Sequence, residues 1–361
     1  MRKVFFLVFG VIALIALGLF VNSIVRATGA YRDLAYQYDG TCLKIDGLVG
    51  AEDIQIDHAT GIAFVSNQDR RKYQAGTPEP GYIAVLDMKQ PRPEAVRIGT
   101  GGIEAFYPHG ISLFRMDNGG LRLFVISHVP DEVDRVEIFD VVDGPEGLPQ
   151  LVHVRTVTDP LLLSPNDLVA VGPEAFYYSN DHGSETDLGR TLEDALRLPR
   201  SNVGYFDGTA ARIVADHMRY ANGVNVSADG KTLYAAEITG RQVRIFNRDP
   251  ASDDLELHDV VPLNTLPDNI DIAQDGSLWI GAHPKIIDFV SHAKDETAHS
   301  PSEVIRLIPD PTGTGGTAEL VYLQDGAEIS GSSVAAAYGS RFLIGAVFDP
   351  HILMCSIPAA K

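Results

Sequence analysis

Six copies of one short pattern run along the sequence, and this repetition limits the folds that the chain can adopt. Each copy has a polar residue, a short apolar strand, a turn that often holds Gly or Asp-Gly, and a second strand ending in small or polar residues. The copies begin at Glu52, His109, Asn166, Asn222, Asn269 and Ser332. Units of about 47 to 63 residues built from paired strands are typical of four-stranded propeller blades. The sequence therefore predicts an all-β fold, a six-bladed β-propeller.

Other architectures fit this pattern less well. A β-sandwich also gives alternating strands, but it does not produce a repeat of this length. The body of the chain shows no long helical period, and Gly and Pro interrupt it throughout. Residues 187–198 are the one segment for which we expect a short helix. We expect residues 31–361 to form a single propeller domain.

The N-terminal segment, residues 1–30, differs from the rest. Arg2 and Lys3 precede an uncharged apolar run over residues 4–21. A helix that rises about 1.5 Å per residue over such a run comes close to spanning a bilayer core of roughly 30 Å. We expect a hydrophobic N-terminal helix that acts as an uncleaved signal-anchor in a membrane, with a cleaved signal peptide as the alternative. The body then lies outside the cytoplasm, either membrane-anchored or, after cleavage, secreted or periplasmic.

The two cysteines, Cys42 and Cys355, flank the repeats. In an exported protein such cysteines pair by default, although two separate buried thiols are the alternative. A closed propeller joins its first blade to its last, and both cysteines lie where that closure falls. A disulfide there would stabilise the ring by roughly 5 kcal/mol in the chain-entropy model.

The formal net charge of −19 bears on the partners of the chain. A field of this sign repels phosphate backbones, so we expect no nucleic-acid partner. The acidic composition is compatible with binding of hard cations, although it can also serve solubility alone. The sequence gives no indication of the oligomeric state.

The residues that begin the inner strands of a propeller meet at one mouth of its central tunnel. Packing favours apolar or small residues there, whereas this chain places oxygen atoms and one imidazole at the mouth. Ca²⁺ takes about six to eight oxygen ligands from carboxylates, amides, carbonyls and water. We predict that one Ca²⁺ is bound by Glu52, Asn166, Asn222, Asp268 and Asn269. For any single residue of this set, capping of a turn is the alternative.

Asp53 and Asp167 directly follow two of these ligands. Because adjacent strand residues point in opposite directions, we expect both to face away from the first ion. We predict that they bind a second Ca²⁺ deeper in the tunnel, together with a backbone carbonyl.

The imidazole at the mouth belongs to His109, and His128 ends the next strand of the same blade. A neighbouring cation disfavours a protonated ring, which leaves His109 able to accept a proton. We predict a catalytic base, with a structural histidine as the alternative. The chain has no Gly-x-Ser-x-Gly elbow, His-Glu-x-x-His motif or P-loop, so a serine nucleophile, a zinc protease and a nucleotide-driven enzyme are disfavoured.

Several stretches of the chain resemble the paraoxonase/arylesterase family of calcium-dependent six-bladed propellers. They are Glu52-Asp53 and residues 107–112, 168–174, 221–225, 268–270 and 343–348. The resemblance runs from about Cys42 to Cys355. It implies a carboxylic-ester hydrolase acting on small lactones and aryl esters, with promiscuous paraoxonase activity as a further possibility. It also implies two Ca²⁺ ions, one catalytic and one structural.

The resemblance further implies a role for individual residues. The catalytic ion keeps the five ligands named above, and the structural ion takes Asp53, Asp167 and the carbonyl of Ile111. His109 and His128 form a catalytic dyad, and Cys42 pairs with Cys355. The sequence departs from the serum members at residues 183–205, which are polar where those members carry an aromatic segment, and at Ala282, where they carry a free cysteine. Residues 70–80 resemble the mobile flap of the family.

These expectations give one mechanism and two rival functions. In the mechanism, the upper Ca²⁺ polarises the ester carbonyl, and His109, supported by His128, draws a proton from the attacking water. Glu52 is the alternative base. The rival functions are a gluconolactonase-type sugar lactonase and a non-catalytic propeller that binds ligands.

Overall fold

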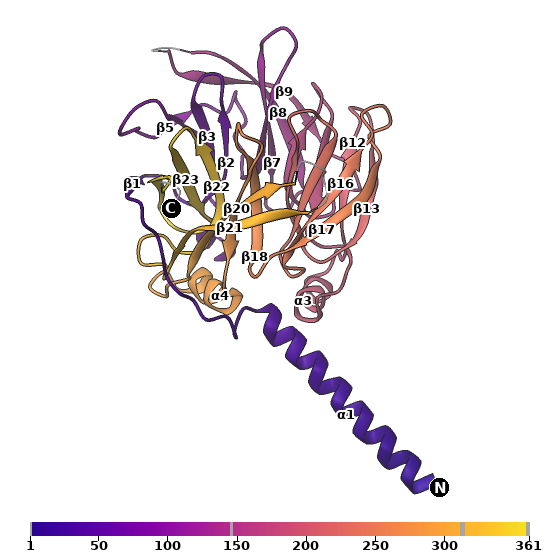
Figure 1. The fold of residues 1–361 in the computed structure, drawn as a ribbon. Coiled ribbons are helices and arrows are strands. Elements are labelled where there is room, and N and C mark those ends of the chain that lie inside the picture. Colours follow the sequence, from indigo (N-terminus) through magenta and orange to yellow (C-terminus); the bar gives the residue numbers. More distant parts are fainter. Residues whose placement is uncertain (1, 145–146, 311–314, 359–361) are drawn as a thin grey trace.

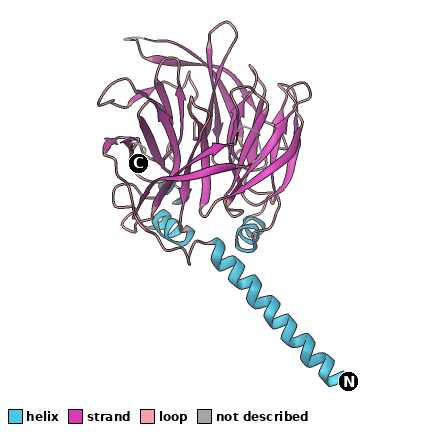
Figure 2. Ribbon diagram, in the orientation of Figure 1, coloured by secondary structure: helices cyan, strands magenta, loops and turns pink. Residues whose placement is uncertain are grey.

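A ring of β-sheets with one projecting helix makes up the computed structural model, which describes residues 2–144, 147–310 and 315–358 (Figures 1 and 2). The described residues form six four-stranded sheets, so the six-bladed propeller is confirmed. Helix α1 (Arg2–Ala27) extends away from one end of the ring.

Each of the first five blades is built from four consecutive strands, with the inner strand first. Blade 1 contains β2 (Ala51–Asp57), β3 (Ile62–Asn67), β4 (Tyr82–Asp87) and β5 (Val96–Ile98). Blade 2 contains β6 (Pro108–Arg115), β7 (Leu121–Ser127), β8 (Arg135–Asp143) and β9 (Pro149–Val157). Blade 3 contains β10 (Pro165–Ala170), β11 (Phe176–Asn180), β12 (Ser201–Phe206) and β13 (Ala211–Met218). Blade 4 contains β14 (Ala221–Val226), β15 (Thr232–Glu237), β16 (Gln242–Arg248) and β17 (Leu255–Pro262). Blade 5 contains β18 (Leu266–Ile272), β19 (Leu278–His283), β20 (Ser302–Pro309) and β21 (Gly316–Gln324).

The sixth blade closes the ring with strands from both ends of the chain. It contains β22 (Ser332–Tyr338), β23 (Arg341–Ala346), β24 (His351–Ser356) and β1 (Cys42–Asp46). Strand β1 pairs antiparallel with β24, and Cys42 lies opposite Cys355 in this register. The two cysteines form a disulfide across 313 residues, which confirms their predicted pairing.

Every inner strand carries a register irregularity at its first residues. In β2 the regular pairing breaks between Ala51 and Ile54, and in β10 it breaks between Pro165 and Leu168. The other four inner strands break at the corresponding place. A bulge redirects side chains and is frequent next to active sites. The residues that begin the six sequence repeats lie in or beside these bulges.

Side-chain hydrogen bonds to the backbone of a neighbouring blade tie all six junctions of the ring. Their distances range from 2.7 to 3.1 Å. The pairs are Asp53 with Ile111, Ser112 with Ala170, Asp167 with Val224, Asn225 with Ile270, Ser332 with Ala282, and Ser333 with Glu52. Apolar strand residues such as Phe64 and Trp279 are buried in clusters between the sheets. The blades are therefore held at fixed positions around the axis.

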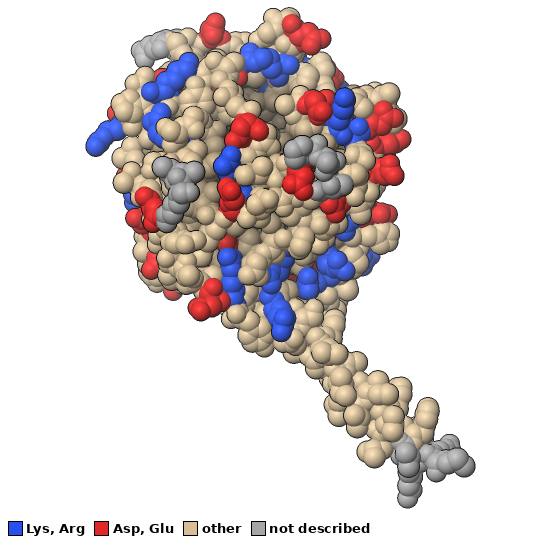
Figure 3. All heavy atoms as spheres, viewed as in Figure 1, with Lys and Arg blue, Asp and Glu red and all other residues tan. Residues whose placement is uncertain are grey.

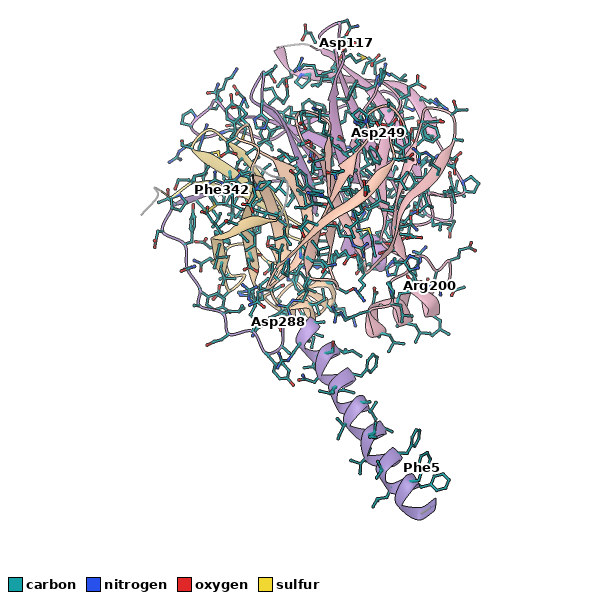
Figure 4. The ribbon with its side chains drawn as sticks, turned by 45° about the vertical axis from the view of Figure 1, so that its right-hand side comes forward. Phe5, Asp117, Arg200, Asp249, Asp288 and Phe342 are labelled. Carbon is teal, nitrogen blue, oxygen red and sulfur yellow. A yellow bond between two sulfur atoms is a disulfide. The ribbon has the colours of Figure 1, made fainter. Side chains whose placement is uncertain are left out.

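Short helices gather at the end of the ring from which α1 projects. Helix α3 (Asp187–Leu196) confirms the predicted helix but ends two residues earlier, where Arg197 adopts a left-handed conformation with φ of 54°. Helices α2 (Arg70–Gln74) and α4 (Ile286–Lys294) were not predicted. Figure 4 labels Asp288 on α4 and Arg200 just after α3, and both lie at this end of the molecule.

Helix α1 is attached to the propeller through its last turn. Gly29 follows the helix with φ of +75°, and a Cβ added there would lie 2.0 Å from the carbonyl oxygen of Pro284. The backbone N–H of Ile286 donates to the carbonyl of Thr28 at 3.1 Å. Charged residues are spread over the propeller, whereas residues 5–25 of the helix have none (Figure 3). The stretch Phe5–Ala27 is long and apolar enough to cross a membrane, as signal sequences also are.

Candidate active site

A pocket of about 620 Å³ opens at the α1 end of the tunnel. Among its lining residues are Glu52, His109, Asn166, Asn222 and Asp268, which the repeat pattern singles out. The outer wall is largely apolar and comes from α1, α4 and blade 6. It includes Ile24, Ala27, Phe289, Val290 and Phe348. The structure thus brings the mouth residues of all but the sixth blade to the floor of one cavity.

Four buried oxygen atoms at this floor have no hydrogen-bond partner among the described residues. They are Oε2 of Glu52 and the Oδ1 atoms of Asn166, Asn222 and Asn269. A buried acceptor without a partner costs stability, so four of them in one place need a common explanation. Turn capping does not supply it, because capping would occupy these oxygens. Oxygen donors from carboxylate and amide groups are the ligands that Ca²⁺ takes, so this set fits the ion.

The carboxylate of Glu52, at the pocket floor, has three polar neighbours. Its Oε1 accepts a hydrogen bond from Nδ2 of Asn269 at 2.7 Å and lies 3.5 Å from Nε2 of His109. Its Oε2 lies 4.0 Å from the guanidinium of Arg70. Burial alone would raise the pKa of Glu52, but His109, Arg70 and Asn269 outweigh it and lower the pKa to about 2. The residue is therefore a carboxylate at neutral pH.

His109 and His128 form the inner part of a hydrogen-bonded chain. Nδ1 of His109 lies 3.0 Å from Nε2 of His128, and Nδ1 of His128 lies 2.7 Å from Oδ1 of Asp134. Burial lowers the pKa of His109 below its ordinary value, although Glu52 acts in the opposite direction. Burial thus favours the neutral ring, in which one nitrogen carries a lone pair that can accept a proton.

Asp53 and Asp167 follow Glu52 and Asn166 in their inner strands, and both are almost inaccessible to solvent. Each accepts a hydrogen bond from the N–H that follows it and one from a neighbouring blade: Asp53 from Ile111 and Asp167 from Val224. Burial and the charge of nearby carboxylates raise the pKa of both. Two buried carboxylates that disfavour each other's charge fit a position for a cation. The binding of a second ion there, and the carbonyl of Ile111 as its ligand, remain predictions.

Several residues of the site were not found from the sequence. Nε2 of His283 lies 2.8 Å from Oδ2 of Asp268, and Nδ2 of Asn166 donates to Asp181 at 3.4 Å. His283 ends β19 and His128 directly follows β7, so the position in the repeat that indicated His128 could also have indicated His283. Asp134 and Arg70 lie in connections between strands, where no period marks a position.

The family model "Arylesterase" matches residues 41–357, which includes every strand of the propeller. The chain belongs to the arylesterase family. Membership of this family places the protein among the carboxylic-ester hydrolases, a class that includes esterases and lactonases.

Curated relatives support the same placement. Serum paraoxonase/arylesterase 1 of Rattus norvegicus is 34% identical over 340 residues, which cover 90% of this chain and 91% of the relative. Serum paraoxonase/arylesterase 2 of Homo sapiens is 34% identical over 323 residues, which cover 88% of each chain.

Solved structures share the fold at lower identity. The calcium-binding protein regucalcin of Agrobacterium tumefaciens has a TM-score of 0.52 at 14% identity and covers 90% of this arylesterase-family chain and 96% of its own. A gluconolactonase of Xanthomonas campestris has a TM-score of 0.50 at 17% identity, with 90% and 91% covered. Among the described residues of the arylesterase-family chain, no group of three or more His, Cys, Asp or Glu side chains is placed to hold a metal. The predicted ligand set relies on asparagine amides, which lie outside such a group.

Proposed function

We propose that the protein is a calcium-dependent hydrolase of lactones and aryl esters, with the catalytic centre at the floor of the pocket. The observation that carries this proposal is the set of four unpaired buried oxygens of Glu52, Asn166, Asn222 and Asn269, next to the imidazole of His109. Family membership supports the reaction class, and the apolar outer wall suits the acyl or aryl part of an ester.

Under this proposal, the chain has a position for each of two ions. The catalytic Ca²⁺ is bound by Glu52, Asn166, Asn222, Asp268 and Asn269, and the structural Ca²⁺ by Asp53, Asp167 and the carbonyl of Ile111. When bound, the catalytic ion supplies Lewis-acid polarisation of the ester carbonyl.

The residues of the chain move the protons. An ionised Asp134 requires a proton on Nδ1 of His128, so Nε2 of His128 is an acceptor and Nδ1 of His109 is the donor to it. Nε2 of His109 then carries the lone pair and takes a proton from the attacking water. The same nitrogen returns this proton to the leaving alkoxide or phenoxide, and the carboxylic acid product ionises.

A lactone panel measured with and without a chelator tests the proposal. We expect aliphatic lactones and phenyl acetate to be hydrolysed, chelation to abolish turnover, and added Ca²⁺ to restore it. His109→Gln should lower kcat by roughly 10²- to 10⁴-fold while calcium binding is retained. Turnover that survives chelation would refute the calcium proposal, and a preference for gluconolactone would identify a sugar lactonase instead. Nearly full activity of His109→Gln would exclude the dyad.

We also propose that residues 1–30 remain on the mature protein as a membrane anchor for the propeller domain, residues 31–361. Two contacts support this proposal: the last turn of α1 lines the pocket, and Arg241 donates to the carbonyl of Arg26 at 2.8 Å. Removal of the segment would open the pocket wall. The intact mass of the protein extracted from the membrane fraction tests this, and a mature chain that starts near residue 28 would refute it.

A further inference from the structure

Arg70 lines the pocket beside Glu52, although it is not part of any of the six sequence repeats. Its guanidinium donates to the carbonyl of Gly50 at 3.1 Å and to that of Pro108 at 3.4 Å, and its side chain is only 12% exposed. It lines the same cavity as Glu52 and His109. Helix α2 therefore places a fixed positive charge beside the proposed reaction centre.

The charge at this place exceeds what the ligand set needs. Glu52 and Asp268 contribute two negative charges, which a bound Ca²⁺ balances. The charge of Arg70 then gives this part of the pocket one net positive charge. Two of the five N–H groups of Arg70 are used by backbone carbonyls, and the others have no hydrogen-bond partner among the described residues. A neutral ester cannot balance this charge. A carboxylate can, and it accepts charge-assisted hydrogen bonds from a guanidinium.

Ester hydrolysis creates a carboxylate at this location. Water adds to the acyl carbon, the acyl–oxygen bond breaks, the ring oxygen becomes a hydroxyl, and the acid releases one proton to solvent. A lactone thus becomes a hydroxycarboxylate with its new negative charge near Glu52. Its carbon chain would then lie against the apolar wall that Phe289, Val290 and Phe348 provide.

We propose that Arg70 is a binding residue for the carboxylate of the product, and that the pocket takes aliphatic hydroxy acids as tightly held products. This inference rests on the proposed lactone hydrolysis. It makes product inhibition a property of the enzyme, because the same charge that attracts the carboxylate slows its release. The competing explanation is that Arg70 only compensates the charges of Glu52 and Asp268.

Equilibrium binding to the calcium-loaded full-length protein separates these explanations. The probes are 4-hydroxydecanoate, which is the ring-opened form of a γ-lactone, and 1,4-decanediol, which has the same chain without the charge. For Arg70→Gln we expect affinity for the acid to fall about tenfold or more, as for loss of a charge-assisted hydrogen bond, and affinity for the diol to change less than about twofold. Lys72→Gln is the matched control, since Lys72 is on the same helix but exposed and paired with Glu79 at 2.7 Å. It should bind both probes as the wild type does.

Calcium titration and a conservative variant complete the test. Arg70→Gln should bind Ca²⁺ at least as tightly as the wild type, because a neighbouring cation has been removed. If Arg70→Gln does not fold, Arg70→Lys carries the test, with an intermediate loss of acid affinity expected. Unchanged affinity for the acid, or equal losses for acid and diol, would overturn the inference. Acid binding that depends on Arg70 in a protein without lactone turnover would uphold carboxylate binding by Arg70 but refute the proposed function and the role of the acid as a product.

Discussion

In the proposed mechanism, two contacts of His128 determine which nitrogen of His109 accepts a proton. The carboxylate of Asp134 fixes a proton on Nδ1 of His128, and the bond between the two rings then leaves the lone pair of His109 on Nε2. Nε2 is the atom that lies 3.5 Å from Glu52 at the pocket floor. Asp134 does not line the pocket, so its proposed role is to position the dyad.

Substitution of Asp134 by Ala should therefore reduce catalysis without reducing metal binding. We expect kcat/KM to fall roughly 10- to 100-fold, mainly through kcat, because the tautomer is no longer fixed. The imidazole ¹⁵N shifts of His128 should show a mixed tautomer in place of a single one. Glu132→Ala, which removes an acid of the same connection paired with Arg135 at 3.2 Å, is the control. A single unchanged tautomer in Asp134→Ala would contradict this role.

Another buried imidazole, that of His182, lies between Asp181 and Asp194. Burial opposes its charge, but its hydrogen bonds to Asp181 and Asp194 and their charges outweigh this and raise the pKa of His182 to about 10. Because the folded-state pKa is raised, the stabilisation is fully present below the unfolded pKa of about 6.5 and is lost as pH rises through about 10.

Thermal unfolding at different pH values tests this balance. The wild type should exceed His182→Gln in Tm at pH 6 to 7, and the difference should shrink towards zero as pH passes about 10. His217→Gln removes an exposed histidine paired with Asp216 at 2.7 Å and should show no such trend. A difference between wild type and His182→Gln that is constant with pH would count against a charged His182.

At the scale of elements, the bulges of the inner strands allow close approach between blades. Gly110 lies in the β6 bulge, and a Cβ there would lie 2.6 Å from the carbonyl oxygen of Asn166 and 2.8 Å from Oδ1 of Asp167. A side chain at this place would push β6 away from the strand that carries two proposed calcium ligands.

Gly110→Ala should therefore destabilise the protein and weaken calcium binding together. Overpacking of this kind costs about 1–3 kcal/mol, which thermal unfolding detects. Gly99→Ala is the control, because a Cβ at Gly99 meets no atom within 4 Å. Equal effects of the two substitutions would show that the contact between β6 and β10 does not decide the result.

The elements also show what the sequence can predict. Residues such as Asn166 and Asn222 were found because a repeat fixes where each inner strand begins, and a ring makes those positions meet. The repeat does not predict α2 and α4, because the connections between strands differ in length and have no repeated sequence pattern. Arg70 and Phe289 lie in such connections and line the pocket. Their positions depend on long-range packing that a single sequence does not encode in any local pattern.

For the whole molecule, stability depends on closing the ring between β1 and β24. The Cys42–Cys355 bond joins these strands across 313 residues. Replacement of both cysteines by Ser should lower Tm by roughly 5 to 15 °C, since the chain-entropy model gives a loss of up to about 5 kcal/mol. Reduction of the wild type by dithiothreitol should have the same effect, and the double variant should not respond to it. A wild type whose Tm is insensitive to reductant would refute the contribution.

The composition of the sixth blade also determines when the ring can close during synthesis of the chain. Strand β1 is the first strand to leave the ribosome, but its partner β24 is the last strand to be synthesised. If α1 stays in the bilayer during export, β1 must wait beside the membrane until almost the whole polypeptide has been translocated. Ser333, whose hydroxyl donates to the carbonyl of Glu52, arrives equally late. A nascent chain that stops before β22 therefore lacks Ser333, which supports Glu52. If Glu52 is a ligand of the proposed catalytic ion, activity appears only after translation is nearly complete.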